Sequence, residues 1–431
     1  MNDFSCLTTQ TATRAWLVDL AEHAIAAVHP MHLLADRIPE APPGRTLVVG
    51  AGKAAAAMAK SLEDAWQAQH PDSPISGMVV MRHGHAEPCR YIEVLEASHP
   101  MPDDLGERAA KRMLKAVQGL NQNDLVIALI SGGGSSLMSL PGGELTLPQK
   151  QQINKLLLRS GTPIREINTV RRHLSAIKGG RLAVAAHPAR VMTYLISDVP
   201  GDDPSLIASG PTLPDDSTPA EALAILEARN IDIPTSVRHH LATGAGSPCR
   251  SDIGFHRDET FILARAADAL QAARQRAEGV GIEVHILGDD LEGEARELGR
   301  TQGLLACNFQ PQISRPLLLL SGGETSVSVK GDGRGGRNVE YLLGLFEALE
   351  GALGIHALAL DTDGIDGSED NAGAMISPQC WQRAREARLS ISEAMENNDA
   401  YTFFAALDDL IVTGPTRTNV NDFRAILIEP R

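Results

Sequence analysis

The chain of 431 residues is long enough for two domains, because single domains usually run to about 100–200 residues. Hydrophobic residues make up 43% of it and charged residues 22%, a mixture typical of globular proteins with apolar cores. The formal net charge of −15 argues against nucleic acids or anionic membranes as main partners. A locally basic site in such a chain can still bind a small anion.

The N-terminal residues and the cysteines indicate a cytoplasmic protein. Residues 1–17 lack the basic start and the apolar run of a secretory signal, and no apolar stretch approaches the length of a membrane span. The five cysteines are widely spaced and form no CxxC pair, which favours scattered reduced thiols. The sequence leaves a monomer and a homodimer open.

Short apolar runs alternate with amphipathic stretches, which predicts an α/β protein with a mostly parallel sheet and helices on both faces. In chain order, strands are expected at 46–50, 75–81, 92–97, 124–131 and 192–199, and helices at 53–69, 104–119, 148–160 and 169–186. Residues 230–260 hold Pro234 and a Gly-rich polar run, and are the expected linker. The alternation then resumes, with strands expected at 261–264, 284–287, 317–321, 356–361 and 410–413.

The two halves of the chain resemble each other. SGGGSSLMS at 131–139 and SGGETSVSV at 321–329 each follow an apolar strand, and in each half a later strand ends in an aspartate-rich turn. Duplication of one domain and chance similarity both explain this pattern. In either case, the polar turns come at the carboxyl ends of strands, where open α/β sheets bind ligands.

The first Gly-rich turn, at 50–55, follows a strand and opens a helix, so backbone N–H groups would face an anion. It is not a Walker A loop, because Leu47 replaces the first glycine and no Ser or Thr follows Lys53. It matches a loose dinucleotide pattern in which Arg82 and His83, rather than an acidic residue, end the second strand. Because a lysine opposes the helix dipole there, Lys53 indicates a bound anion, with a plain packing turn as the alternative.

Two further Gly-rich segments predict anion binding. The turn SGGGSS at 131–136 can form a nest of N–H groups for a phosphate or carboxylate, with a flexible loop as the alternative. The segment GRGGRN at 333–338 places Arg334 and Arg337 ahead of a helix, where they can clamp an anion. A solvated basic loop is the alternative for this segment.

Two acidic turns predict a divalent metal. Carboxylates at alternating positions of a Gly-containing turn suit Mg²⁺, and the missing distal Glu of an EF-hand argues against calcium. Helix caps and Asx turns are the alternative explanation. The expected metal ligands are Asp198, Asp202, Asp361, Asp363 and Asp366. Anion-binding Gly-rich segments, basic side chains and metal-binding carboxylates are the groups that phosphoryl transfer requires.

A series of blocks in order over residues 46–423 resembles the class II glycerate kinases, which are glycerate 2-kinases with a C-terminal MOFRL domain. The blocks are VVGAGKAAAAMA, HPMPD, SGGGSSL, INTVRRHLSAIKGGRLA, LISDVPGDDPSLIASGPT, LLLSGGETSV, GRGGRN, LDTDGIDGSEDNAGA and GPTRTNVNDF. Each block alone is weakly specific, whereas the ordered set is highly specific.

The resemblance implies a kinase that uses ATP and Mg²⁺ to convert D-glycerate into 2-phospho-D-glycerate. It implies a large N-terminal Rossmann-like α/β/α sandwich, at 1–245, and a smaller α/β MOFRL domain, at 246–431, whose tail can pack back on the first domain. The active site of the family lies in the cleft between these domains.

Carried over onto this sequence, the resemblance implies catalytic roles for Lys53, Asp198 and Arg337. The residues expected to bind substrate or phosphate are Gly50, Gly52, Gly132, Gly133, Gly134, Ser135, Ser136, Glu324, Arg334 and Asn338. The chain departs from the family pattern at Arg417, where a small residue is expected, and at Ala264 and Arg265, where a Gly and an Asn-containing turn are expected. These departures can alter the nucleotide pocket or the substrate preference without removing the chemistry.

Two other functions remain open. One is an NAD(P)H-dependent reductase of hydroxypyruvate or tartronate semialdehyde, a name that bacterial family members near tartrate-degradation genes have carried. The other is a non-catalytic protein that binds small anions. The sequence does not fix the preferred hydroxy acid.

Overall fold

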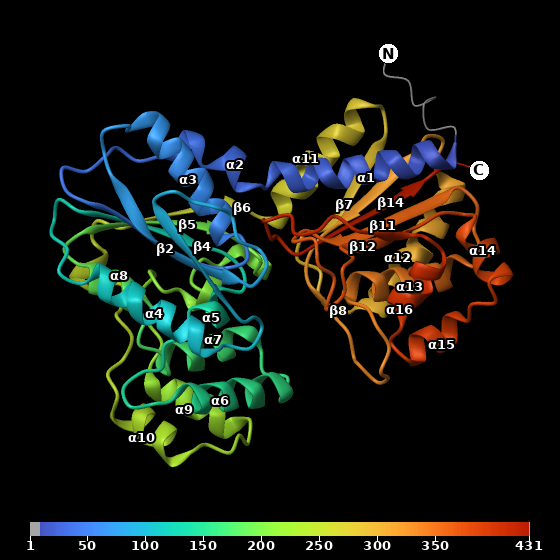
Figure 1. Ribbon diagram of the computed structural model, residues 1–431. Helices are drawn as coiled ribbons and strands as arrows, with labels where there is room; N and C mark the ends of the chain where they lie inside the picture. The colour runs from blue at the N-terminus through green and yellow to red at the C-terminus, as the bar shows by residue number, and fades with distance from the viewer. Residues whose placement is uncertain (1–8, 431) are drawn as a thin grey trace. The chain divides into compact units, whose positions relative to one another are not determined.

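The computed structural model describes residues 9–430, which divide into two compact units (Figure 1). The first unit is Pro30–Leu263, and the second combines the segment that ends at His29 with the chain from Ala264 onward. The change from one unit to the other therefore lies at 263/264, whereas the sequence predicted a boundary at 245/246. The domain limits 1–245 and 246–431 stay a prediction.

The first unit is built on a six-stranded sheet in the order β3-β2-β1-β4-β5-β6. The four pairs formed among β1 to β5 are all parallel, as the alternation of strands and helices predicted. The strands are β1 (Thr46–Ala51), β2 (Ile75–Arg82), β3 (Ile92–Ala97), β4 (Leu125–Ile130), β5 (Arg190–Ile196) and β6 (Glu259–Ala264). Because β4 is buried along its whole length, its carboxyl end leads directly from the core into the Gly-rich turn that follows.

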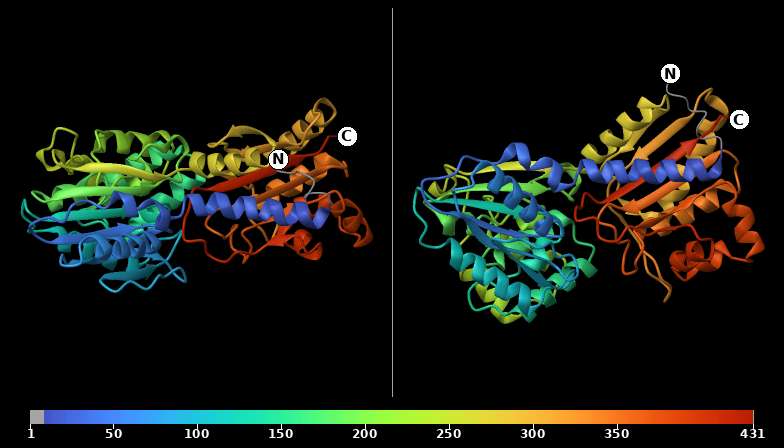
Figure 2. Two further views of the ribbon diagram at one scale, coloured as in Figure 1. Left: turned by 90° about the horizontal axis from the view of Figure 1, so that it is seen from above. Right: turned by 45° about the horizontal axis from the view of Figure 1, so that its top comes forward.

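Helices cover both faces of this sheet (Figures 1 and 2). The alanine-rich α3 (Ala55–Gln69) packs on β1 and β2 from one face, and α4 (Asp104–Val117) packs on β2 and β3 from the other. The short helices of this part are α2 (Pro30–Leu33), α5 (Gly134–Leu137) and α8 (Arg181–Ala186). Small alanine side chains let α3 lie close to the sheet, since Ala55, Ala56 and Ala59 are fully buried.

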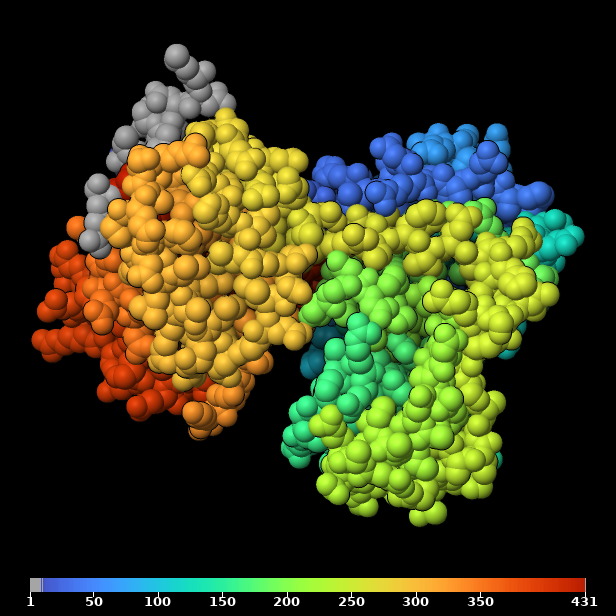
Figure 3. Space-filling view, turned by 180° about the vertical axis from the view of Figure 1, so that it is seen from behind, coloured from blue at the N-terminus to red at the C-terminus, as the bar shows by residue number. Residues whose placement is uncertain are grey.

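Four further helices form a lobe with its own apolar core (Figure 3). They are α6 (Leu147–Arg159), α7 (Ile164–His173), α9 (Pro219–Ala228) and α10 (Thr235–Thr243). The expected linker at 230–260 is wrong in part, because α10 buries Val237 and Leu241 in the core of this lobe.

The single helix expected at 169–186 is also wrong. The chain leaves the helix after His173 and re-enters one at Arg181. Gly179 and Gly180 have φ values of +57° and +77°, in the left-handed region that glycine tolerates and a continuous helix excludes. The turn between α7 and α8 carries Lys178 to the Gly-rich turn at 131–136.

The second unit is built on a six-stranded sheet in the order β13-β12-β11-β14-β9-β7. Of its pairs only β7–β9 is parallel, so the expectation of a mostly parallel sheet is wrong for this unit. The strands are β7 (Glu283–Gly288), β9 (Leu317–Ser321), β11 (Ile355–Asp361), β12 (Gly373–Ile376), β13 (Leu410–Ile411) and β14 (Asp422–Ile428). Two short strands, β8 (Gly293–Glu294) and β10 (Thr325–Ser326), pair apart from it.

Helices also cover both faces of the second sheet (Figures 1 and 2). On one face lie α1 (Gln10–Ala27) and α11 (Ala266–Gly279), and on the other α12 (Ala295–Phe309) and α13 (Arg337–Leu349). The remaining helices are α14 (Cys380–Glu386), α15 (Ile391–Glu396) and α16 (Ala400–Ala406). The two-domain α/β class expected from the sequence is therefore confirmed. Among residues 9–430, no helix combines the length and the apolar character needed to span a bilayer.

Candidate functional site

Two Gly-rich turns meet at the carboxyl ends of β1 and β4, which are neighbouring parallel strands. The backbone N–H of Lys53 donates to the carbonyl of Gly132 at 2.8 Å, and that of Ala54 donates to Ser131 Oγ at 3.0 Å. Gly52 has a φ of +142°, and a Cβ there would come within 2.1 Å of Ser131 Oγ. Only glycine therefore lets the two turns approach this closely.

Lys53 lies half-buried beside the second turn. A Cβ on Gly133 would lie 3.4 Å from Lys53 Cγ and 3.0 Å from the ring of His99. Gly133 has a φ of +78°, so both its backbone shape and its surroundings require glycine. The absent side chain keeps a space open between Lys53 and His99.

Two other glycines predicted to bind anions, Gly50 and Gly134, lie close to the backbone of neighbouring strands. A Cβ on Gly50 would meet the carbonyl of Leu129 at 2.3 Å, and one on Gly134 would meet the carbonyl of Ala51 at 2.7 Å. Their side-chain positions therefore face backbone. Anion binding by their N–H groups stays a prediction.

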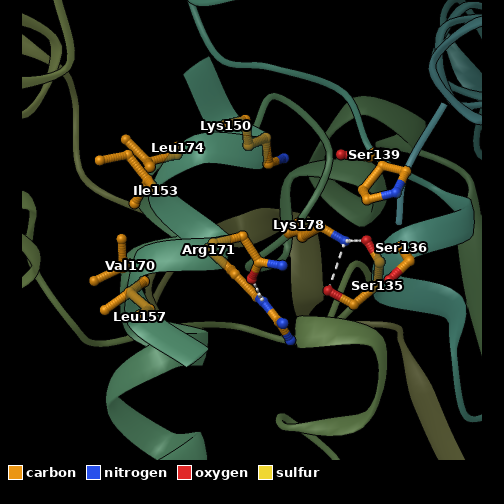
Figure 4. Close-up of a pocket in the computed structure, with 12 residues that line it drawn as sticks. Ser135, Ser136, Ser139, Lys150, Ile153, Leu157, Val170, Arg171, Leu174 and Lys178 are labelled. Atoms are coloured by element: carbon orange, nitrogen blue, oxygen red, sulfur yellow. Dashed lines mark hydrogen bonds between the residues drawn. The ribbon is translucent and has the colours of Figure 1, made fainter. Parts of the chain in front are cut away.

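A narrow pocket opens beside Ser135 and Ser136, within the first unit (Figure 4). One side of it is aliphatic, and the other is polar and basic. The aliphatic side chains are Ile153, Leu157, Val170 and Leu174, and the basic ones are Lys150 from α6, Arg171 from α7 and Lys178 from the turn after α7. The pocket therefore extends the Gly-rich turn at 131–136 into the helical lobe.

The three basic side chains are held by neutral oxygen atoms. Lys178 Nζ donates to the carbonyl of Ser135 at 2.6 Å and to its Oγ at 3.1 Å. Lys150 Nζ donates to the carbonyl of Leu140 at 3.3 Å, and Arg171 Nε donates to Asn154 Oδ1 at 2.7 Å. Within residues 9–430, the three cations form no ion pair, and no Asp or Glu lines the pocket.

The pKa values of these three basic groups are lowered, because they are shielded from water and have no carboxylate of the described residues beside them. Burial, together with the positive charges of Arg171 and Arg181, lowers the pKa of Lys150 to about 7. The pKa of Lys178 is lowered well below its usual range, first by burial and then by Lys150 and Arg171. Burial also lowers the pKa of Arg171 to about 10. Positive charge in this pocket is therefore destabilised until an anion enters it.

The first aspartate turn follows β5, so it lies at the same edge of the sheet as the two Gly-rich turns. Asp198 and Asp202 are half-buried in this turn. Asp203 accepts hydrogen bonds from the backbone and hydroxyl of Ser205 and pairs with Arg165 at 3.2 Å, so it stabilises the turn itself. Asp198 and Asp202 are the expected metal ligands on this unit.

In the second unit, Arg337 is enclosed by carboxylates. Its Nε donates to Asp422 at 2.7 Å, its Nη2 to Asp361 at 2.6 Å and its Nη1 to Glu324 at 3.2 Å. Burial opposes the charge of Arg337, but Asp422 and Asp361 hold its pKa well above the usual range. Asp422 also pairs with the buried Arg424. Since all three nitrogens of Arg337 have a carboxylate partner, the guanidinium organises this acidic cluster.

The second acidic turn satisfies its own carboxylates in large part. Asp366 accepts from the backbone N–H groups of Asn338 and Val339 at 3.0 and 2.9 Å, so it caps the start of α13. Burial raises the pKa of Asp366 to about 6, although these hydrogen bonds oppose the shift. Asp363 accepts from the N–H of Ile365 two residues on, which is an Asx turn. These contacts support the structural explanation of this turn.

The outer arginine of the 333–338 segment is exposed. Arg334 pairs with Glu369 through Nε at 2.9 Å, and its guanidinium lies 4.4 Å from the ring centre of Tyr401. Asn338 is buried instead, and its Nδ2 donates to Asp422 at 2.8 Å. The predicted anion clamp is thus divided between an exposed arginine and a half-buried one, and both already have acidic partners.

The carboxylates form no dense metal cage. In the part of the chain that the structure describes, no group of three or more His, Cys, Asp or Glu residues is placed to hold a metal ion. Mg²⁺ that binds through substrate phosphates needs only one or two protein carboxylates. Asp198 and Asp202 supply hard oxygen ligands at the correct edge of the sheet, so these residues fit such an ion.

Comparisons with known proteins cover almost the whole chain. The family models that match are "Domain of unknown function (DUF4147)", over residues 16–242, and "MOFRL family", over residues 317–422. The D-glycerate 2-kinase of Thermotoga maritima is 36% identical over 94% of this chain and 96% of its own length. A crystal structure of glycerate kinase from the same organism has a TM-score of 0.86 and 36% identity, covering 97% of this chain and all of that one. The chain belongs to the glycerate 2-kinase family.

Other similar proteins carry a different name. A protein of Agrobacterium vitis, provisionally named a hydroxypyruvate reductase, is 49% identical over 99% of this chain and 98% of its own length. The small residue that the family pattern expects at position 417 has a physical reason. Arg417 has a φ of +68°, in the left-handed region that favours the glycine expected there.

Reasoning from the sequence missed the basic pocket. Arg171 and Lys178 lie in the block INTVRRHLSAIKGGRLA, which supported the resemblance without a role for either residue. The available signal was a lysine between apolar residues and two glycines, in Ala-Ile-Lys-Gly-Gly. Lys150 gave no signal, because its segment has the composition of an ordinary amphipathic helix.

Proposed function

We propose that this protein is a glycerate 2-kinase that transfers the γ-phosphoryl group of ATP to the 2-hydroxyl of D-glycerate. The similarity to glycerate kinases over nearly the full length of both chains supports the reaction. The observation that carries the proposal is the pair of joined Gly-rich turns, with Lys53 beside them and a basic pocket next to them. A cytoplasmic enzyme that binds a small hydroxy acid, with no nucleic-acid or membrane partner, completes the proposal.

Phosphoryl transfer depends mainly on positioning and on compensation of charge. We assign the N–H groups of the turns at 50–55 and 131–136 to the phosphates, and Lys53 to the charge that develops on the transferred group. Asp198 would accept the proton of the 2-hydroxyl group of D-glycerate. The hydroxyl oxygen would then form the new bond to the γ-phosphorus while the bond to ADP breaks and ADP leaves. In the second unit, Arg337 would hold Asp361 and Asp422 in place.

The proposal also includes a magnesium ion. Asp198 and Asp202 would hold the ion, which when bound neutralises charge on the phosphates of ATP. Asp366 is a poor ligand, because its two oxygens already accept N–H groups of α13. This assignment makes the turn after β5, rather than the turn after β11, the place of the metal.

One preparation of the purified protein can test the kinase against the reductase. We expect ADP release that requires D-glycerate, stops on chelation of divalent ions, and yields a product that enolase consumes, because enolase acts on 2-phosphoglycerate. The alternative predicts oxidation of NADPH with hydroxypyruvate and no ADP release. That second result, or a product that enolase rejects until a mutase is added, would overturn the proposal.

A further inference from the structure

The basic pocket of the first unit concentrates more positive charge than the chain compensates. Lys150 and Lys178 are 7% and 1% exposed, and neither they nor Arg171 has a carboxylate partner within residues 9–430. A buried cation is costly unless a negative charge accompanies it. Other buried arginines of this protein follow that rule, since Arg172 pairs with Asp215 at 2.9 Å and Arg424 pairs with Asp422. The exception at this pocket indicates an anion from outside the chain.

The donors converge from separate elements of the fold. Lys150 comes from α6, Arg171 from α7 and Lys178 from the turn after α7, and the hydroxyl-bearing Ser135 comes from α5 (Figure 4). Lys178 donates two hydrogen bonds to Ser135, and an ammonium group has a third N–H to give. The Nη groups of Arg171 have no partner among the described residues, since its Nε alone bonds to Asn154. The chain therefore leaves donors available in the pocket.

Ser135 has a fixed orientation. Its hydroxyl accepts from Lys178 at 3.1 Å and lies 3.0 Å from Ser209 Oγ, which in turn donates to Asn168 at 2.6 Å. Because Asn168 takes the proton of Ser209, the hydroxyl of Ser135 has a defined acceptor in the oxygen of Ser209. The pocket is thus preorganised on its polar side.

We propose that this pocket binds the carboxylate of the small hydroxy acid, free of metal, through Lys150, Arg171 and Lys178. This inference rests on the proposed function for the identity of the acid. The pocket shares the turn at 131–136 with Lys53, since the backbone N–H of Lys53 donates to Gly132 and Ser135 lines the pocket. The carboxylate would hold one end of the substrate while its hydroxyl end remains at this turn.

The lining distinguishes a small acid from magnesium-bound ATP. Mg²⁺ requires oxygen ligands such as carboxylates, and no Asp or Glu among the described residues lines the pocket. Ile153, Leu157 and Val170 form an aliphatic side that offers no hydrogen-bond donor to a triphosphate. Two buried lysines and the half-buried Arg171 can accommodate a single carboxylate, because the amine of Lys150, with a pKa of about 7, can give up its proton when no anion is bound.

The test compares Lys150→Met and Lys178→Met with Lys155→Met, an exposed lysine on the same helix α6. We expect the Kd of D-glycerate, measured by calorimetry without ATP, to rise roughly 10–100-fold in the two pocket variants, as for the loss of a hydrogen bond to a charged group. The KM of glycerate should rise similarly while the KM of ATP stays unchanged. Lys155→Met should match the wild type, and glycerol, which lacks the carboxylate, should not bind.

A measurement on the wild-type protein avoids any question of folding in the variants. Around Lys150, burial and the positive groups Arg171 and Arg181 disfavour its proton, and Glu107 favours it. A bound carboxylate would raise the pKa of this amine. The protein should therefore take up protons when D-glycerate binds at pH 8, and fewer protons when it binds at pH 6. Calorimetry in two buffers of different ionisation enthalpy measures this uptake.

Three outcomes would overturn the inference. They are a rise in the KM of ATP alone, unchanged binding of D-glycerate in both pocket variants, and binding to the wild type without proton uptake at pH 8. Failure of the proposed function is a separate result, because it appears as a wild-type protein that releases no ADP with D-glycerate. The binding of D-glycerate without ATP still decides the inference in that case.

Discussion

The basic pocket of the first unit and the Arg337 cluster of the second both bury positive charge, but they compensate it differently. Arg337 has three carboxylate partners, in Asp361, Asp422 and Glu324. Lys150 and Lys178 bond only to oxygens of Leu140 and Ser135 among the described residues. In the Arg337 cluster, carboxylates of the protein compensate the positive charge, whereas in the basic pocket a bound anion would have to do so. Removing a cation should cost folding stability in the cluster and ligand affinity in the pocket.

The largest effect is expected from Arg337→Met. This change leaves Asp422 and Asp361 buried at 2% exposure without their main counter-charge, and breaking such a pair costs about 3–5 kcal/mol of unfolding free energy. Urea denaturation measures the loss. Arg334→Met is the matched control, because Arg334 lies on the same segment with an exposed side chain, and it should leave stability nearly unchanged. Equal stability of the two variants would contradict the comparison.

Lys53→Ala should separate turnover from stability. Lys53 lies beside Gly133 at the turn that the pocket shares, and it supports the charge of the transferred phosphoryl group in the proposed reaction. Loss of such an electrostatic contact usually lowers kcat by about 10²-fold or more. Steady-state ADP release measures this loss, and thermal unfolding should show a wild-type transition. Near-normal turnover in a folded variant would exclude Lys53 from the chemistry.

A further effect is expected on the pH dependence of stability. The folded protein holds the pKa of Lys150 at about 7, while the unfolded chain keeps it near the ordinary 10.5. Between these values the unfolded state binds more protons, so the free energy of unfolding should rise with pH from about 7 to 10. Lys150→Met should flatten this rise, and Lys155→Met should retain it. Denaturation midpoints across this pH range measure the difference, and identical slopes in all three proteins would contradict the pKa assignment.

Local patterns predicted the elements that surround the site. Strands β1 and β4 and the glycines after them could be located because an apolar run followed by Gly-rich sequence has few other interpretations. The break between α7 and α8 was missed, since the apolar periodicity of 169–186 continues through Ala176 and Ile177 although Gly179 and Gly180 end the helix. The antiparallel pairs of the second sheet were missed because strand direction depends on connections between distant segments.

The pocket itself could not be predicted from spacing. Ser135, Lys150, Arg171 and Lys178 meet only after the helical lobe folds against the turn that follows β4. Each is ordinary in its own segment, and only their common burial without acidic partners is informative. The acidic turn at 361–366 shows the reverse case, because its suggestive spacing turned out to include a helix cap at Asp366.

Helix α1 gives the chain a particular order of assembly. It opens the described chain but packs in the second unit, where Arg14 bonds to Asp409 across 395 residues and the hydroxyl of Thr418 bonds to the carbonyl of Val28. A single helix of this length is marginal in water by itself. During synthesis α1 therefore emerges before the first unit, whereas its partners, from α11 onward, emerge after that unit. A chain truncated before α11 would hold the complete first unit together with an α1 that lacks the helix it packs against.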